Sequence, residues 1–552
     1  MPISPNLRRY ETFAVRQRAL ADGGMSHALH IRQTRQSLNL VNKFTTCFRS
    51  LATMSDGVLE KYDLCILGCG PGGFAGAMRA LDLGKHVCIV EGSEIGGTGV
   101  MWGALASKTM WELAKDYDVA AKVDRGYRAA ELVVNYQAVR NTVMQAVKEK
   151  QYQMLSQIET FSPRCWDGTG SLTLKRGRGS FAAPGKVEVT YAYGRKEDVC
   201  ADNFLISTGS TPRNLPDIDV DQQRILNSDG ILNLKEFPKR LMIIGAGIIG
   251  CEYATIFSNF DQTKVYLVDH ETRIIPFEDE DVSDFVSANL RKNNVDILHS
   301  ASLKNIFKHE DHLEAVLYFD AGHSMVVEVD AVLISIGRIP NLSGIGLGNI
   351  GVEPNAMGYL EPDLNCCVAD RIYAAGDVIR HPALVNLAEM ESRHAVEHLF
   401  GAGQRPLNYS NMSTVMFFKP AVAAVGLNEK ICRKKKIPYR VAYYSNALLS
   451  RAIAMRAVTG FVKIIVSDDQ DQMILGMRAA GPQVSNTIMT VAMLMDQGKG
   501  IKDLLKTVHP HPTMSEGIQE CLRLLLDKSI YKCRAFPDQV KIQTWRPETA
   551  SG

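Results

Sequence analysis

The stretch that decides the fold is YDLCILGCGPGGFAGAMRALDLGKHVCIVEG, at residues 62–92. Its apolar pattern predicts a strand over 62–67, a helix through residue 83 and a second strand over 86–90. Gly68, Gly70 and Gly73 form a G-x-G-x-x-G loop between the first strand and the helix. The first glycine permits a tight turn, the second lets the backbone approach a pyrophosphate, and the third lets the helix pack on the strand. The stretch therefore predicts a dinucleotide at a helix N-terminus, with Glu91 bound to its ribose.

The same pattern occurs again in RLMIIGAGIIGCEYATIFSNFDQTKVYLVDH, at residues 240–270. A strand is expected over 241–244, followed by Gly245, Gly247 and Gly250, and a second strand ends at Asp269. Two complete fingerprints predict two bound dinucleotides. One should be a flavin and the other a nicotinamide, because that pairing transfers hydride.

Composition narrows the class of protein. The 552 residues are too many for one ordinary core, and 46% apolar residues with a net charge of +2 indicate a globular protein. This charge favours neither nucleic acid nor an acidic membrane as a partner, and no stretch is long and apolar enough to span a bilayer. The 12 cysteines contain no C-x-x-C motif, so no metal site is expected and the thiols are predicted to be reduced and buried. The basic run CRKKK at 432–436 is predicted to be a solvated surface patch.

The N-terminal segment differs from the rest of the chain. Residues 25–54 contain no Asp or Glu but several arginines among Ser, Thr and Gln. An acid-poor, arginine-bearing leader is typical of a transit peptide, which predicts a mitochondrial location and cleavage near residues 49–55. The alternative is a disordered tail, which would leave the protein in the cytoplasm.

Four further segments carry a family resemblance. They are LISTGSTPR at 205–213, ISIGRIPN at 334–341, RIYAAGDV at 371–378 and HPHPTMSE at 509–516. Together with the two loops, they make the chain resemble the two-dinucleotide flavoprotein disulfide reductases, the class I pyridine nucleotide-disulfide oxidoreductases, over about residues 60–535.

The resemblance implies an α/β fold with two three-layer, Rossmann-like domains that bind FAD and NAD, and a C-terminal α+β dimerisation domain. Family members are homodimers in which the C-terminal segment of one subunit completes the active site of the other. The expected boundaries are a transit peptide over 1–55, the first FAD-binding segment over 56–214, the NAD-binding domain over 215–335, the second FAD-binding segment with the central segment over 336–408, the dimerisation domain over 409–535 and a tail over 536–552.

Residues 96–108, GGTGVMWGALASK, separate two branches of the family. The disulfide branch has G-G-T-C-x-N-x-G-C-x-P-S-K, which places Gly99 and Ala104 at its two cysteine positions. The soluble pyridine nucleotide transhydrogenases lack a complete cysteine pair, and WGALASK looks like their sequence. The resemblance thus implies an FAD enzyme that takes hydride from NADH and passes it directly to a second nicotinamide nucleotide or another small acceptor. A dihydrolipoamide dehydrogenase-like enzyme and a non-catalytic FAD-binding subunit are the alternatives.

The resemblance also implies catalytic residues. Lys108 would lie beside the flavin with Glu252 as its partner, and the pair would favour negative charge that develops on the ring during reduction. Ile248 would cover the flavin as a gate for the nicotinamide. His511 and Glu516 match a general-base pair of the disulfide branch, so they are either a proton donor to a non-thiol acceptor or a structural hydrogen bond.

The implied cofactors are FAD and NAD(H), with NADP(H) as the alternative nucleotide. An acid at position 269 accepts a hydrogen bond from the 2′-hydroxyl of NAD and repels the 2′-phosphate of NADP, and Glu271 adds to the repulsion. Arg273 is the only nearby base that opposes them, so NADH is the expected donor. The implied cofactor-binding residues are Gly68, Gly70, Gly73, Glu91, Gly97, Thr98, Lys108, Gly179, Ser207, Thr208, Gly209, Gly245, Gly247, Ile248, Gly250, Glu252, Asp269, Gly337, Asp377, Ala383 and Leu384.

Overall fold

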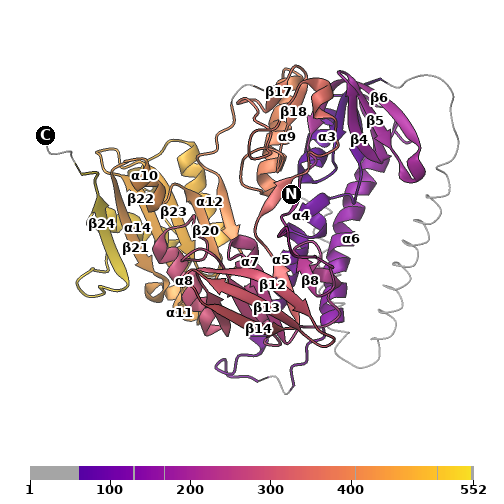
Figure 1. The fold of residues 1–552 in the computed structure, drawn as a ribbon. Coiled ribbons are helices and arrows are strands. Elements are labelled where there is room, and N and C mark those ends of the chain that lie inside the picture. Colours follow the sequence, from indigo (N-terminus) through magenta and orange to yellow (C-terminus); the bar gives the residue numbers. More distant parts are fainter. Residues whose placement is uncertain (1–60, 129–130, 167, 404–405, 507, 549–552) are drawn as a thin grey trace, which may run out of the picture. The chain divides into compact units, whose positions relative to one another are not determined.

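The structure of this protein is a computed structural model that describes residues 61–548 except 129–130, 167, 404–405 and 507. The expected transit peptide at 1–55 lies outside the described residues. Figure 1 shows the sheets with their helices, coloured along the sequence. The expected fold class is confirmed: two α/β units carry the two glycine loops, and an α+β unit follows them.

The first sheet is built around the first glycine loop. Its main path has the order β17-β18-β6-β1-β2-β3, and the strands from β18 to β3 run parallel. The parallel pairing brings the carboxyl ends of β1 and β2 to one edge, where the loop lies. The strands are β1 (Lys61–Leu67), β2 (His86–Glu91), β3 (Ser171–Arg176), β4 (Arg178–Ala183), β5 (Lys186–Thr190), β6 (Lys196–Ile206), β17 (Cys367–Ala369) and β18 (Ile372–Ala374).

Helices cover this sheet and continue to the second unit. Helix α3 contacts β1 and β2 on one side and α9 on the other, and α5 contacts both α6 and α7. The helices are α3 (Pro71–Asp82), α4 (Gly97–Met101), α5 (Ala104–Ala120), α6 (Tyr136–Thr160) and α9 (Val385–Leu399). A two-stranded sheet of β7 (Ser210–Pro212) and β16 (Arg338–Pro340) joins the segments that leave the first and second units.

The second sheet repeats the parallel plan in the order β11-β10-β9-β15-β8. An antiparallel sheet, β12-β13-β14, follows β11 along the chain. The elements are β8 (Ile225–Asn227), β9 (Arg240–Ile244), α7 (Ile248–Asn259), β10 (Lys264–Val268), α8 (Glu280–Lys292), β11 (Val295–Leu298), β12 (Ala301–Lys308), β13 (Leu313–Phe319), β14 (Ser324–Val329) and β15 (Ala331–Ile334).

The C-terminal unit is a six-stranded antiparallel sheet in the order β19-β20-β23-β22-β21-β24, on which α12 and α14 pack. Its elements are β19 (Ser413–Met416), β20 (Val422–Gly426), α10 (Glu429–Lys434), β21 (Tyr439–Ser445), α11 (Ser450–Ala454), β22 (Phe461–Ser467), β23 (Ile474–Ala480), α12 (Val484–Asp496), α13 (Ile501–Leu504), α14 (Glu516–Leu525) and β24 (Val540–Trp545). Short 3₁₀ turns occur at Ala192–Gly194, Ile231–Asn233, Leu347–Ile350 and Asn446–Leu448.

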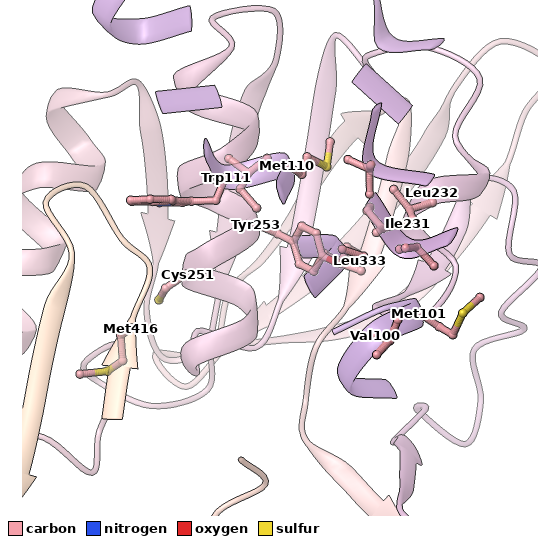
Figure 2. Close-up of a cluster of buried hydrophobic side chains, with 14 of the residues drawn as sticks. Val100, Met101, Met110, Trp111, Ile231, Leu232, Cys251, Tyr253, Leu333 and Met416 are labelled. Atoms are coloured by element: carbon pink, nitrogen blue, oxygen red, sulfur yellow. The ribbon is translucent and has the colours of Figure 1, made fainter. Parts of the chain in front are cut away.

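Buried strands and helices from both α/β units share one core. Residues 64–67 of β1, 241–244 of β9 and all of β15 are buried, which explains the apolar sequences of these segments. Figure 2 shows Val100 and Met110 in this core, together with Tyr253 and Leu333 of the second unit. The packing fixes the helix that bears Lys108 against the helix that bears Glu252.

Arg433–Lys436 are exposed, as the basic run predicted. No helix in the described ranges has the length and apolar character that crossing a membrane requires. The described cysteines are free and most are at least half-buried, but Cys165 is exposed, so the prediction of buried thiols was wrong there. Cys165 lies in the turn after α6, where the side chain has no core to enter.

Candidate active site

The first glycine loop is closed by the acid at the end of β2. The backbone N–H of Gly68 donates to the carbonyl of Val90 at 2.8 Å. The Glu91 carboxylate then accepts from the N–H of Cys69 and from the N–H of Ser93, both at 2.6 Å. Burial raises the pKa of Glu91, and the two N–H donors oppose that rise. Glu91 therefore holds the loop in shape at the position where the sequence predicts a ribose.

The second loop has the same hydrogen-bond pattern. The N–H of Gly245 donates to the carbonyl of Val268 at 2.8 Å. The Asp269 carboxylate accepts from the N–H of Ala246 and, at 2.8 Å, from the N–H of Glu271. Each loop thus uses an acid from the neighbouring strand to bind the residue after its first glycine.

The second and third glycines of each loop have different surroundings. A Cβ at Gly73 would lie 2.0 Å from the carbonyl oxygen of Gly68, and one at Gly250 would lie 1.9 Å from that of Gly245. The third glycine therefore lets the helix pack on the turn. At Gly70 and Gly247 a Cβ would meet nothing within 4 Å. That open space lies at the N-termini of α3 and α7, whose free N–H groups favour an anion, so both loops fit the pyrophosphate of a dinucleotide.

Lys108 and Glu252 form an ion pair between α5 and α7. The Lys108 Nζ lies 2.7 Å from the Glu252 Oε2, and the Glu252 Oε1 accepts from the N–H of Phe417 at 3.0 Å. The ammonium also lies 4.9 Å from the centre of the Phe417 ring. Glu252 is only 5% exposed, whereas Lys108 is partly exposed. A buried carboxylate thus fixes a more accessible ammonium, as the sequence predicted for this pair.

Phe417 was not predicted from the sequence. It lies directly after β19 and is far from Lys108 and Glu252 along the chain, so no local spacing indicates it. Its ring packs edge-on against Trp111 at 5.2 Å. The segment from the C-terminal unit therefore helps to build this ion-pair site.

Arg338 joins several segments that the sequence had singled out separately. Its guanidinium donates to the Thr98 Oγ1 at 3.1 Å and to the Ser210 Oγ at 2.8 Å, and it pairs with Asp229 at 3.4 Å. The Ser210 Oγ in turn donates to the Asp377 Oδ2 at 2.5 Å. Burial raises the pKa of Asp229, and Arg338 opposes that rise. Arg338 belongs to the motif ISIGRIPN, but its role as a hub depends on tertiary contacts.

Glu391 is a second residue that the sequence did not reveal. It is fully buried on α9 and accepts from the N–H of Gly376 at 2.8 Å. Its other oxygen lies 2.8 Å from the His381 Nδ1 and accepts from the Tyr409 hydroxyl at 3.3 Å. An acid on the apolar side of an amphipathic helix was the available signal. Glu391 fixes the turn that leads into Asp377.

His511 and Glu516 are hydrogen-bonded to each other. The His511 Nδ1 lies 2.8 Å from the Glu516 Oε1, and the Glu516 Oε2 accepts from the N–H of Thr513 at 2.8 Å. The His511 side chain is 66% exposed. Within the described residues, no hydrogen bond or ion pair links these two residues to Lys108 or Glu252.

The other predicted cofactor residues lie in several environments. Gly97, the first residue of α4, has φ +48° and its Cβ position is 3.1 Å from the Gly70 Cα, so the start of α4 touches the first glycine loop. Gly179 packs on Leu67 and faces no open space, since a Cβ there would lie 2.7 Å from the Leu67 Cδ2. The remaining ones sit at or near the carboxyl ends of strands or at helix starts: Ser207, Thr208, Gly209, Ile248, Gly337, Ala383 and Leu384.

The two positions that resemble cysteine sites differ in the room around them. A Cβ on Gly99 would lie 2.5 Å from the Pro71 Cγ and 3.0 Å from the Val385 Cγ2. Ala104 is the first residue of α5 and is partly exposed. The neighbours of Gly99 therefore fill the space that a side chain there would need.

Comparisons with known proteins agree with this fold. Residues 62–392 match the family described as pyridine nucleotide-disulphide oxidoreductase, and residues 412–522 match its dimerisation domain. The mitochondrial dihydrolipoyl dehydrogenase of Dictyostelium discoideum is 30% identical over 481 residues, which cover 86% of this chain and 96% of that protein. The dihydrolipoyl dehydrogenase of Bacillus subtilis strain 168 is 30% identical over 477 residues, covering 85% and 99%. The solved structure of the HOCl-induced flavoprotein disulfide reductase RclA from Escherichia coli has a TM-score of 0.74 at 25% identity, and the match covers 84% of this chain and 100% of that one.

Proposed function

The chain belongs to the pyridine nucleotide-disulphide oxidoreductase family of FAD-dependent enzymes, and we propose that it takes hydride from NADH and passes it from the flavin directly to a second nicotinamide nucleotide or another small acceptor. In this proposal no disulfide lies between the flavin and the acceptor. The observation that carries it is the pair Gly99 and Ala104, because neither side chain has a sulfur atom. The contact of Pro71 and Val385 around Gly99 supports it, since the space for a side chain is closed.

The described residues fit FAD at the first loop. Gly68–Gly73 and the start of α3 would hold its pyrophosphate, Glu91 its ribose, and Asp377 its ribityl chain. Bound FAD would accept hydride from a reduced nicotinamide and release two electrons to an acceptor. Arg338 and Ser210 would keep the Asp377 carboxylate in position through the hydrogen bonds described above.

Lys108 and Glu252 would provide the electrostatic part of the mechanism. The ammonium is fixed by a buried carboxylate and by an aromatic face, so it needs little reorganisation when negative charge appears nearby. The Phe417 N–H satisfies the second oxygen of Glu252, which leaves that carboxylate bound on both sides. We expect the pair to stabilise the reduced flavin.

The second loop supports NADH as the donor. The Asp269 carboxylate lies in a loop where Glu271 follows two residues later, and both acids would repel a 2′-phosphate. Arg273 does not oppose them freely, because its guanidinium pairs with Asp284 and, at 3.5 Å, with Glu280. This arrangement disfavours NADP(H), which the transhydrogenase branch also uses.

Dihydrolipoamide dehydrogenase activity is the second candidate. It is favoured by the match of 85% or more of this chain to proteins of that name. The retained His511–Glu516 hydrogen bond also favours it. Residues 99 and 104 oppose it, because this activity as the resemblance implies it needs the cysteine pair.

An anaerobic titration of the FAD-loaded protein with NADH separates the candidates. Direct transfer predicts complete flavin reduction by one NADH per FAD and no thiolate charge-transfer band. Uptake of two NADH per FAD with such a band would overturn the proposal and support the disulfide enzyme. Failure of NADH to reduce the flavin would support a non-catalytic FAD-binding subunit. A stopped-flow screen of NAD⁺ analogues, NADP⁺ and quinones against the reduced enzyme would then identify the acceptor.

We propose that the FAD domain is split between residues 56–214 and 336–408, with the NAD domain over 215–335 and the dimerisation domain over 409–535. The match to the dimerisation domain supports a homodimer. Relatives named as mitochondrial support a mitochondrial location, which imaging of the full-length chain with a C-terminal tag would test.

A further inference from the structure

The hairpin between β12 and β13 brings together two imidazoles and a carboxylate, in the sequence HEDHLE at residues 309–314. We propose that His309, His312 and Glu314 bind a divalent transition-metal ion, with Zn²⁺ as the reference ion. The proposed redox chemistry does not use this hairpin. The sequence expectation of no metal site was based on cysteine spacing, and it did not consider donors that meet across a hairpin.

Strand pairing explains why the three side chains meet. Phe307 pairs with Glu314, and the His309 N–H donates to the carbonyl of His312 at 3.0 Å across the turn. Side chains alternate between the faces of a strand, so residues 307 and 309 share a face with residues 312 and 314. The register of the hairpin therefore places both histidines and Glu314 on one face.

The donor atoms already approach each other. The His309 Nε2 lies 3.4 Å from one oxygen of Glu314, and the His312 Nε2 lies 4.0 Å from the other. The two rings stack at 4.5 Å with planes 12° apart. Zinc–nitrogen and zinc–oxygen bonds of about 2.0–2.2 Å separate tetrahedral ligands by roughly 3.4 Å, so only small side-chain movements are required.

Asp311 prepares His312 to act as a ligand. Its carboxylate lies 2.8 Å from the His312 Nδ1. A carboxylate on one ring nitrogen keeps the proton there and leaves the lone pair of the other nitrogen available to a metal. In this arrangement the free lone pair is on the Nε2, the atom that faces Glu314.

Arg224 forms hydrogen bonds with the backbone of the turn. It donates to the carbonyl of His309 at 2.8 Å and to the carbonyl of His312 at 3.4 Å. The backbone at both ligand positions is thus fixed by one guanidinium. The three ligand side chains are partly exposed, which leaves a fourth position open to water.

The other cluster of this kind in the described residues differs in one respect. Asp279, Asp281 and Glu429 also lie close together, but the ammonium of Lys463 already lies 2.8 Å from Asp279 and 2.8 Å from Asp281. That cation already lies between the three carboxylates. Within the described part of the chain, Glu314 forms no ion pair with a lysine or an arginine, so no side-chain ammonium or guanidinium pairs with the carboxylate between His309 and His312.

Isothermal titration of the tag-free, FAD-loaded protein with ZnCl₂ near neutral pH tests the proposal. A Cys165→Ser background removes the exposed thiol as a competing ligand. We expect one Zn²⁺ per chain, and at least a 10-fold weaker binding in His309→Ala/His312→Ala and in Glu314→Gln. Asp311→Asn should weaken binding by about 10-fold, the lower end for a residue that orients a ligand. Cu²⁺ should bind more tightly than Zn²⁺.

His323→Ala is the matched control, because His323 lies in the β13–β14 hairpin of the same sheet and stacks on Phe319. It should bind Zn²⁺ as the parent does. The proposal is overturned if the parent binds no Zn²⁺, or if the double histidine variant binds it with unchanged affinity. NADH-dependent flavin reduction, measured in the same samples, distinguishes a failure of this site from a failure of the proposed redox function.

Discussion

Lys108 is held from three directions by groups of different chemical kinds. Glu252 supplies the opposite charge, the Phe417 ring supplies an aromatic face, and the Ser107 hydroxyl lies 3.3 Å from the ammonium. These contacts restrict the side-chain conformations of Lys108. An ammonium held in one place can stabilise negative charge that develops at a fixed point nearby.

Replacing Lys108 with methionine tests that charge. The variant keeps an unbranched side chain close to the length of the lysine stem but removes the ammonium, so flavin reduction by NADH should slow by about 100-fold or more. Stopped-flow absorbance of the bound flavin measures the rate. Lys115→Met is the control, because Lys115 lies on the same helix and also faces an aromatic ring, at 4.8 Å from Trp111. Equal rates in the Lys108 variant and the parent would contradict the assignment.

A second prediction concerns Gly99 and Ala104. Installing both cysteines should not produce a disulfide enzyme, because the new Cβ at position 99 would overlap Pro71. Overpacking of this kind costs about 1–3 kcal/mol, so Gly99→Cys should lower Tm while Ala104→Cys alone should be tolerated. Calorimetry measures the Tm of each variant. Peptide mapping of the thiols and an assay of dihydrolipoamide turnover test whether a working disulfide forms. A stable disulfide with lipoamide turnover in the double variant would show that the prediction is wrong.

At the scale of elements, the two strand–loop–helix units share one set of backbone contacts. Each acid at a strand end binds the residue after the first glycine and the residue two positions after itself. This repetition was predictable from the sequence, because glycine spacing and strand pattern act locally. The hub at Arg338 and the contribution of Phe417 were not, since both depend on segments that are far apart along the chain.

The shared pattern predicts separable effects. Glu91→Gln should weaken FAD retention and leave the KM for NADH unchanged, whereas Asp269→Asn should raise the KM for NADH and leave the FAD content unchanged. A hydrogen bond to a charged group contributes about 1.5–3 kcal/mol, so each change should be roughly 10- to 100-fold. The FAD content after desalting measures FAD retention. Steady-state kinetics with NADH and NADPH measure the KM for each nucleotide. Loss of FAD from the Asp269 variant would contradict the separate assignment of the two loops.

Buried ion pairs connect α8 and its preceding turn to the C-terminal sheet. Lys463 on β22, only 2% exposed, binds Asp279 at 2.8 Å, and Arg478 on β23 binds Glu278 at 2.8 Å. Burial acts to raise the pKa of Asp279, but Lys463 and the backbone N–H groups of Lys430 and Glu429 together outweigh it and hold that pKa below its ordinary value. These pairs fix the orientation of the two units, since unpaired charges in such surroundings are strongly unfavourable.

Lys463→Met should therefore destabilise the protein by about 3–5 kcal/mol at neutral pH, because it leaves the Asp279 carboxylate buried without its ammonium partner. Lys196→Met, which removes an exposed pair with Glu188, is the control and should have no measurable effect. A lowered carboxyl pKa stabilises the fold above the ordinary aspartate pKa and loses this effect as the pH falls through the lowered value. The difference between parent and Lys463→Met in urea unfolding should accordingly shrink at acidic pH. A constant difference would assign the effect to packing.

For the whole molecule, the sequence predicted the fold class but not how closely segments that are distant along the chain pack against each other. Fold class follows from repeated local patterns, which the strands and glycine loops carry. The closing of the space around Gly99 by Pro71 and Val385 is a property of packing between distant segments.

A homodimer is the expectation at this scale, and light scattering should give twice the mass of the chain. Helix α12 carries Met489 and Met493 on one face, 53% and 55% exposed in the single chain. We expect the partner to cover them, so Met489→Asp/Met493→Asp should shift the protein toward the monomer. Met325→Asp on β14 is the control for an exposed methionine outside the dimerisation domain. A monomeric parent would contradict the homodimer, and a dimeric variant would place the interface elsewhere.

The matching geometry of the two glycine loops has a consequence for inhibitor selectivity. A compound that imitates only the adenosine diphosphate portion common to both nucleotides would meet the same backbone N–H groups and a carboxylate at either loop. Discrimination must come from the residues in which the loops differ, namely Pro71 against Ile248 at the first helical position and Glu91 against Asp269 at the strand end. Ligands that extend toward one of these differences are starting points for a compound that displaces the nucleotide from one loop and leaves the other nucleotide bound.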